Sequence, residues 1–219
     1  MIWILLLCHF IADYPLQTDA IARGKKHVRG LIVHVAIHFI TLLVIMVGVL
    51  RMDLSLVLPA ILALTGLHFA IDTWKNILSN LRPGWVIFTY LQDQVLHVIS
   101  ILVVVSWVGF GTDIPRSSWI IPALSLVWVT HVWFVTERLV TYKSPEYQQW
   151  VNGQSWPRMT GRALILSAWF IGSNLWALLV LVVGLFHHWI DLAGPFHSRA
   201  LLIDISVVLC VVAGLTLIY

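Results

Sequence analysis

The chain has 219 residues, of which 60% are hydrophobic and only 11% are charged. A soluble globular domain averages about 45–50% apolar and about 25% charged residues, so the composition excludes an ordinary soluble domain and predicts a multi-pass membrane protein. The formal net charge of +3 comes from basic residues that cluster in the loops, which is how membrane orientation is set and gives no indication of nucleic-acid binding.

About seven apolar segments are expected, all α-helical, as a transmembrane bundle in one integral membrane domain over residues 1–219. The first, Met1–Asp13, is short, because at about 1.5 Å per residue it spans about 20 Å of a hydrocarbon core that is about 30 Å thick. It should end at Tyr14-Pro15, since the residue before a proline is disfavoured in the α region. The other six segments are expected at Gly30–Leu50, Leu54–Lys75, Trp85–Phe110, Ser118–Arg138, Arg162–Phe186 and Arg199–Tyr219.

Lysines and arginines are divided unevenly between the two ends of these segments. Ten of the thirteen fall at the end that carries loops 14–29, 76–84 and 139–161, namely Arg23, Lys25, Lys26, Arg29, Lys75, Arg82, Arg138, Lys143, Arg158 and Arg162. The positive-inside rule places that end in the cytoplasm. Residues 139–161 interleave Trp and Tyr with polar residues, which predicts an interfacial cytoplasmic loop at the lipid headgroups. The loop His187–Ser198 is expected on the opposite side.

Four pairs of ionisable residues lie four positions apart in or beside the apolar segments. They are His9 with Asp13, His34 with His38, His68 with Asp72, and Asp93 with His97. Residues i and i+4 of a helix share a face, and the expected topology puts all four pairs in the cytoplasmic half of the membrane. An ionisable side chain in hydrocarbon costs about 2.5–3.5 kcal/mol on insertion scales. Four such pairs at one depth therefore predict one shared site more readily than four separate helix-packing contacts.

Five imidazoles and three carboxylates at one depth are typical of a metal site. Zinc accepts both ligand types, with manganese or iron as alternatives. Because tetrahedral zinc takes four ligands, the eight residues fit either two metals or one metal with orienting groups behind its ligands. Asp13, Asp72 and Asp93 are also the candidate catalytic residues. Gln17 and Lys75 are candidate substrate-binding residues. Gln17 follows the first pair closely enough to reach the site, and the ammonium group of Lys75 cannot ligate a cation but can hold a phosphate.

These motifs resemble an uncharacterised family of bacterial inner-membrane proteins, domain of unknown function 3307. The resemblance rests on His9–Asp19, a basic residue near Lys25, His34, the segment His68–Lys75, and Asp93-Gln94 with His97. It covers roughly the first half of the chain, and residues 98–219 carry no matching motif. The resemblance implies a multi-pass protein of the bacterial inner membrane and no assigned reaction.

The residues predict a membrane-embedded metal-dependent enzyme, a hydrolase acting on a lipid-linked or phosphorylated substrate at the cytoplasmic leaflet. One alternative is a transporter of divalent cations or protons, because intramembrane His and Asp residues also line ion paths. Another is a binding or assembly subunit with a structural metal. A di-iron oxidoreductase fits less well, since no HxxHH motif accompanies the single HxxxH. The expected partners are the lipid bilayer and an anionic or lipid-linked substrate, and the oligomeric state is left open.

Overall fold

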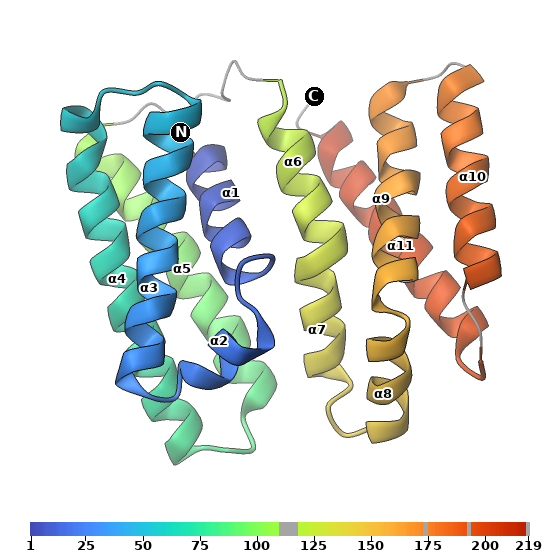
Figure 1. Cartoon of the computed structure of the whole chain (residues 1–219), viewed down its shortest axis with the longest axis horizontal. Helices are drawn as coiled ribbons and strands as arrows, with labels where there is room; N and C mark the ends of the chain where they lie inside the picture. Colours follow the sequence, from blue (N-terminus) through green and yellow to red (C-terminus); the bar gives the residue numbers. More distant parts are fainter. Residues whose placement is uncertain (110–117, 173–174, 192–193, 218–219) are drawn as a thin grey trace. The chain divides into compact units, whose positions relative to one another are not determined.

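The computed structural model describes residues 1–109, 118–172, 175–191 and 194–217 (Figure 1), so the expected turn Gly111–Arg116 lies outside the described residues. All regular elements of the described ranges are helical: α1 Ile2–Asp13, α2 Asp19–Gly24, α3 Val28–Leu43, η1 Val44–Val49, α4 Leu54–Leu81, α5 Val86–Val108, α6 Ile120–Val127, η2 Trp128–Val132, α7 Trp133–Val140, α8 Pro145–Gly153, α9 Ser155–Ile171, α10 Leu175–Asp191 and α11 His197–Thr216. Five continuous helical stretches are long and apolar enough to cross a membrane: Val28–Val49, Leu54–Leu81, Val86–Val108, Ile120–Val140 and His197–Thr216. The prediction of an all-α, multi-pass membrane protein is confirmed.

The chain forms two compact units, Met1–Leu124 and Ser125–Tyr219, which we call the N-terminal and the C-terminal unit. In the N-terminal unit four helices close a ring, because α1 packs on α3, α3 on α4, α4 on α5, and α5 on α1. Successive helices of the ring run in opposite directions (Figure 1). Their outward faces are apolar, with Leu56, Leu62 and Val103 exposed by 56–66%, as expected for side chains that meet lipid.

The start of the chain follows the expectation closely. Helix α1 ends at Asp13, directly before Tyr14-Pro15. The following loop contains the short helix α2, whose N-cap Thr18 accepts a hydrogen bond from the backbone N–H of Ile21. After α2 the chain turns tightly into α3, and a Cβ on Gly30 would lie only 2.2 Å from the carbonyl oxygen of Gly24. This close backbone approach requires a glycine at position 30.

Helix α4 is longer than the sequence pattern suggested. The expected connection 76–84 is helical as far as Leu81, so that α4 has 28 residues. No proline or glycine interrupts residues 76–81, and the helix ends at the residues before Pro83, where the α region becomes unfavourable. Lys75 and the polar side chains that follow it are therefore held on a helix and not on a loop.

In the C-terminal unit the single segment expected over Arg162–Phe186 is instead two helices, α9 and α10. They separate at Gly172, whose φ of 92° is in the left-handed region that favours glycine. The two helices pack side by side in opposite directions (Figure 1). At Gly184 a Cβ would lie 2.9 Å from the Cβ of Leu164, so a small residue permits this close contact.

The extra chain reversal at Gly172 changes the side on which the last helix, α11, begins. The ring of Phe196, just before α11, lies 5.0 Å from that of Tyr147 in α8, and the guanidinium of Arg199 lies 5.0 Å above the Tyr147 ring. The beginning of α11 is therefore on the same side as α8. The expectation that the loop His187–Ser198 faces the opposite side from residues 139–161 is wrong, because α9 and α10 cross back where one helix was expected.

Candidate metal centre

The ring of four helices brings all eight predicted His and Asp residues together at its centre. We call them the His/Asp cluster: His9 and Asp13 on α1, His34 and His38 on α3, His68 and Asp72 on α4, and Asp93 and His97 on α5. None of the eight is more than 6% exposed. Since each pair projects from one face of its helix and the four helices close a ring, the pairs meet in the interior and not at the lipid-facing surface.

Asp13 lies in the middle of four imidazoles. Its Oδ1 atom is 2.9 Å from Nε2 of His38, 3.0 Å from Nε2 of His34 and 3.7 Å from Nε2 of His68. Its Oδ2 atom is 3.6 Å from Nε2 of His9. Within the described part of the chain no lysine or arginine forms an ion pair with this carboxylate.

The other two carboxylates each have a lysine partner. Lys25 places its Nζ 2.7 Å from Oδ2 of Asp72, and Lys75 places its Nζ 2.6 Å from Oδ2 of Asp93. His97 bridges the two carboxylates, since its Nε2 lies 3.3 Å from Oδ1 of Asp93 and 3.8 Å from Oδ1 of Asp72. Two of the three carboxylates therefore have an ammonium partner, whereas Asp13 has none among the described residues.

Several nitrogen and oxygen atoms of the cluster lack a hydrogen bond of normal geometry. They include Nε2 of His9, Nε2 of His97 and Oδ1 of Asp93, all fully buried. A buried polar atom without a partner is costly, and a bound cation would satisfy such atoms. Three sets of ligand atoms lie close enough to hold a metal ion: His9, Asp13, His38 and His68; His34, His68 and Asp72; and Asp72, Asp93 and His97.

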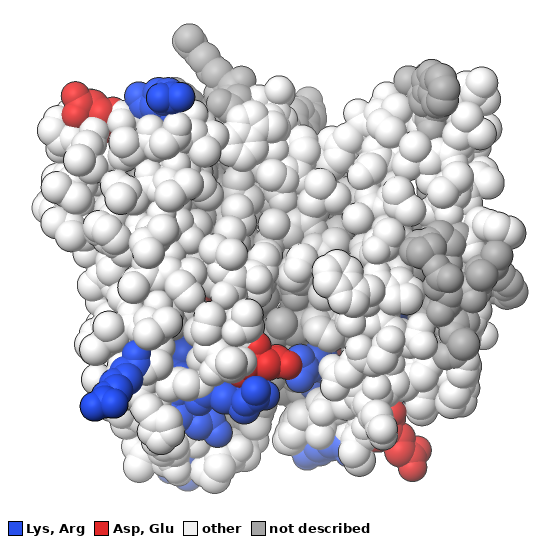
Figure 2. All heavy atoms as spheres, in the orientation of Figure 1, with Lys and Arg blue, Asp and Glu red and all other residues white. Residues whose placement is uncertain are grey.

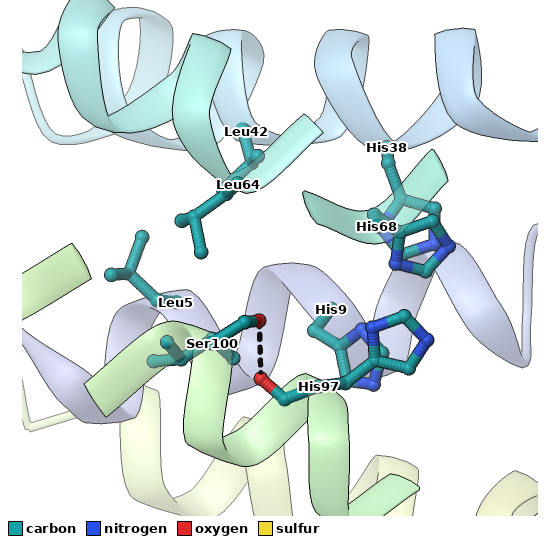
Figure 3. A pocket seen from close by; sticks show the side chains of 9 residues that line it. Leu5, His9, His38, Leu42, Leu64, His68, His97 and Ser100 are labelled. Carbon is teal, nitrogen blue, oxygen red and sulfur yellow. Dashed lines mark hydrogen bonds between the residues drawn. The ribbon is translucent and has the colours of Figure 1, made fainter. Parts of the chain in front are cut away.

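A small cavity adjoins the first of these sets. Its volume is about 20 Å³, enough for one water molecule or ion. Figure 3 shows the imidazoles of His9, His38, His68 and His97 at one end of this cavity, and the side chains of Leu5, Leu42 and Leu64 at the other. The cavity is therefore polar on the side of the cluster and apolar on the far side.

The two predicted substrate-binding residues lie at the loop end of the cluster. Lys75 forms the ion pair with Asp93 described above, and its side chain is 29% exposed. Gln17 accepts a hydrogen bond of 3.0 Å at Oε1 from Nζ of Lys25. Lys25 is itself only 8% exposed, and its backbone carbonyl accepts a hydrogen bond from Asn76. The turn after α2 is thus anchored on α4 directly beside the cluster.

A further hydrogen-bonded chain supports Asp93. The Tyr14 hydroxyl lies 2.8 Å from that of Tyr90 and donates a hydrogen bond to Oε1 of Gln94, whose Nε2 donates one to Oδ2 of Asp93. Tyr14 and Tyr90 were not among the predicted site residues. The position of Tyr14, directly after Asp13 where α1 ends, was the available signal.

Residues 1–127 match the family described as Protein of unknown function (DUF3307). The chain belongs to this family. The match covers every residue of the His/Asp cluster together with Lys25 and Lys75, so the DUF3307 region contains the whole candidate site. Searches of curated proteins and of solved structures found no match to the chain.

Beyond the DUF3307 match, the C-terminal unit has a buried charged network of its own. Arg158 donates to Oδ1 and Oδ2 of Asp204 at 2.6 and 2.7 Å, and its Nη2 lies 2.9 Å from Oε2 of Glu137. Arg162 also pairs with Asp204, at 3.0 Å. The four charged groups are at most 4% exposed. They join α7, α9 and α11, and their two positive and two negative charges balance.

This network was not predicted from the sequence, because both arginines fall among the basic residues at an expected cytoplasmic boundary. Tyr147 completes it by donating a hydrogen bond of 2.6 Å to Oε1 of Glu137. Burial, followed by this hydrogen bond, raises the pKa of Tyr147 to about 12. Since the charges are balanced and paired with one another, we interpret the network as a structural connection between helices and not as a catalytic site.

Proposed function

We propose that the chain is a membrane-embedded, metal-dependent hydrolase that acts on a lipid-linked or phosphorylated substrate at the cytoplasmic leaflet of a bacterial inner membrane. The observation that carries the proposal is the surroundings of Asp13: a buried carboxylate with four imidazoles around it and no lysine or arginine partner among the described residues. A divalent cation at this position would neutralise the carboxylate of Asp13 and use the imidazole nitrogens as ligands.

The spacing of the ligand atoms supports a metal at Asp13. Four ligands about 2.0–2.1 Å from a tetrahedral zinc ion lie about 3.3 Å from one another. Oδ1 of Asp13 lies 2.9 Å from Nε2 of His38 and 3.7 Å from Nε2 of His68, and Oδ2 lies 3.6 Å from Nε2 of His9. Zinc is the first candidate, with manganese or iron as alternatives, because all three accept imidazole together with carboxylate.

A catalytic role fits better than a purely structural one. A structural zinc has all of its coordination positions filled by protein, whereas a catalytic one keeps a position for water. Three of the four candidate ligands His9, Asp13, His38 and His68 would hold such a metal, and the cavity of about 20 Å³ beside them provides room for the water in the fourth position. A bound metal would lower the pKa of the water and so supply a hydroxide nucleophile.

The proton acceptor in this proposal is His97. It lines the same cavity, and its Nε2 atom lies 3.3 Å from Oδ1 of Asp93. A carboxylate in that position holds the Nε2–H of the neutral ring, so that the other nitrogen, Nδ1, would take up the proton and the carboxylate would stabilise the imidazolium that forms. In this proposal Asp93 orients His97, and Asp72 and Asp93 are each paired with a lysine. Asp13 is a ligand of the metal.

The transporter alternative receives less support from the site. A transported ion needs polar groups on both sides of its binding site. The far wall of the cavity is mostly formed by Leu5, Leu42, Leu64 and Ile101, which offer no ligand. The hydroxyl of Ser100, which also lines the cavity, donates to the backbone carbonyl of His97. The polar route instead leads from the cluster through Lys25 and Lys75 to the loop side, as expected for a site that is approached from one side only.

Metal content tests the proposal directly. We expect purified wild-type protein to hold about one zinc, manganese or iron ion per chain by inductively coupled plasma mass spectrometry. Asp13→Asn should lose it, because the substitution removes the ligand charge. Asp19→Asn is the matched control, since Asp19 lies in α2 outside the cluster, and it should keep the metal. Wild-type protein that stays metal-free after incubation with all three ions would overturn the proposal.

A further inference from the structure

A second, larger pocket opens on the loop side of the His/Asp cluster. It has a volume of about 270 Å³ and is lined by Gln17, Ala22, Lys25, Lys26, Lys75, Asn76, Ser79 and Asn80. We call it the lysine pocket. Pockets for drug-sized ligands begin at about 300 Å³, so this one suits a small charged group. Three lysines without a lining carboxylate make it a pocket for an anion.

The helical extension of α4 builds one wall of the lysine pocket. Lys75 and Ser79 are four positions apart, as are Asn76 and Asn80, so these four side chains occupy one side of the helix. Ile77 and Leu81, on the other side, are 47% and 71% exposed. The wall therefore has a polar face toward the pocket and an apolar face that suits lipid.

The length of α4 indicates where the pocket lies relative to the membrane. Its 28 residues extend about 42 Å at about 1.5 Å per residue, more than the hydrocarbon core of about 30 Å. The last turns of α4, which line the pocket, thus reach the headgroup layer. Figure 2 shows Lys and Arg side chains of the N-terminal unit gathered at this end, where α2 and the end of α4 lie.

The three lysines of the pocket have N–H groups that are not used in the hydrogen bonds and ion pairs described above. An ammonium group has three N–H donors. Lys25 uses two, on Asp72 and Gln17, and Lys75 uses one, on Asp93. Lys26 is exposed and forms no ion pair with a described residue. One complete ammonium group and three remaining N–H donors, with side-chain amides beside them, match the charge and the acceptor oxygens of a phosphate.

We propose that the lysine pocket binds a phosphate group, and that Lys25 and Lys75 couple phosphate binding in this pocket to cation binding in the His/Asp cluster. The first half stands on the pocket alone, whereas the second rests on the proposed function. When a phosphate shares the two ammonium groups, Asp72 and Asp93 lose part of their neutralising charge in a buried environment. A cation then binds the cluster more tightly. By linkage, a bound cation strengthens phosphate binding by the same factor.

The phosphate pocket is tested first on metal-free protein, so that the result does not depend on the proposed function. One arm measures inorganic phosphate by equilibrium dialysis against protein in phosphatidylcholine nanodiscs. The other counts phosphatidic acid molecules retained by delipidated protein in native mass spectrometry. Lys26→Gln should weaken binding about tenfold, because it removes a charge-assisted hydrogen bond. Lys143→Gln removes an equally exposed lysine from the C-terminal unit and should leave binding unchanged.

Each outcome either supports or overturns the proposal that the lysine pocket binds a phosphate group. Binding of phosphatidic acid alone, weakened by Lys26→Gln, identifies a lipid headgroup as the ligand. Binding of inorganic phosphate, similarly weakened, shows that the phosphate group itself is sufficient, whether or not the lipid also binds. Equal binding by Lys26→Gln and wild-type protein, or no binding in either arm, overturns the proposal.

The coupling is measured afterwards as the zinc dissociation constant with and without the phosphate ligand found above, by competition with a fluorescent chelator. Tighter zinc binding by about fivefold or more is expected. An unchanged constant overturns the coupling and leaves the pocket standing. Protein that binds phosphate but no metal at all would contradict the proposed function separately.

Discussion

Lys25 and Asp72 form an ion pair of 2.7 Å between Nζ and Oδ2 in which both side chains are buried, with exposed fractions of 10% and 1%. The lysine comes from the turn after α2, and the aspartate from the middle of α4. The pair lies between the His/Asp cluster and the lysine pocket, so several predictions concern these two groups and their neighbours.

Lys25→Met should lower the free energy of unfolding by about 3–5 kcal/mol, because it leaves Asp72 buried without its counter-charge. Reversible unfolding in SDS would measure the change. The double variant Lys25→Met/Asp72→Asn should recover most of the loss. Lys26→Met is the matched control: Lys26 is exposed, and its replacement should change stability by less than about 0.5 kcal/mol. Equal effects of the two single variants would contradict the role of the ion pair.

Lys75→Met should retain metal and bind it about fivefold more tightly, since Asp93 would then lack its lysine and the cluster would be more negative. Competition with a chelator on purified protein would measure this. Lys143→Met should leave metal affinity unchanged. If Lys75→Met loses the metal, the lysine is needed to hold the cluster together, and the assigned charge relationship is wrong.

Gly30→Ala should displace the turn between α2 and α3, because its Cβ would meet the Gly24 carbonyl oxygen at 2.2 Å. The expected cost is about 1–3 kcal/mol of unfolding free energy. The displacement should also weaken phosphate binding, since Lys25 is on this turn. Gly66→Ala, in α4 with nothing within 4 Å of the added Cβ, is the control and should be neutral or stabilising. A Gly30→Ala variant as stable as Gly66→Ala would refute the close approach.

Arg158→Met should lower the free energy of unfolding by about 3–5 kcal/mol, because Asp204 and Glu137 are buried and lose a shared partner. The folded variant should still bind metal, since the cluster belongs to the N-terminal unit. Unfolding and metal content are both measured on the same preparation. Loss of metal from folded Arg158→Met protein would show that the network serves the metal centre.

Gln149 and Ser198 should be labelled from the same side of the membrane. The ring contact between Trp150 and Phe196, at 5.8 Å, places α8 next to the start of α11. Single cysteines at the two positions, in a Cys8→Ala/Cys210→Ser background, can be treated with a membrane-impermeant maleimide in right-side-out and inside-out vesicles. Labelling from opposite sides would restore the seven-segment topology with one helix over Arg162–Phe186.

The amino-acid sequence was sufficient for the helical class, the membrane environment and the pairing of the candidate site residues along each helix. A hydrophobic run specifies a helix that crosses lipid, and a spacing of four specifies two side chains on one face, so His68 and Asp72 could be paired from the sequence alone. The same reasoning applied to all four pairs, because each depends only on the local geometry of one helix. The catalytic and metal-binding roles of these residues remain predictions.

Tertiary structure decided which groups neutralise one another. Asp13, Asp72 and Asp93 are equivalent by helical spacing, yet two have a lysine partner and Asp13 has imidazoles only. That difference arises because α1, α3, α4 and α5 close a ring and the turn after α2 folds back on α4, which are contacts between distant parts of the chain. Likewise, the reversal at Gly172 brings Asp204 to Arg158. Local periodicity reports the helix face of a side chain, but its partner depends on how the helices pack.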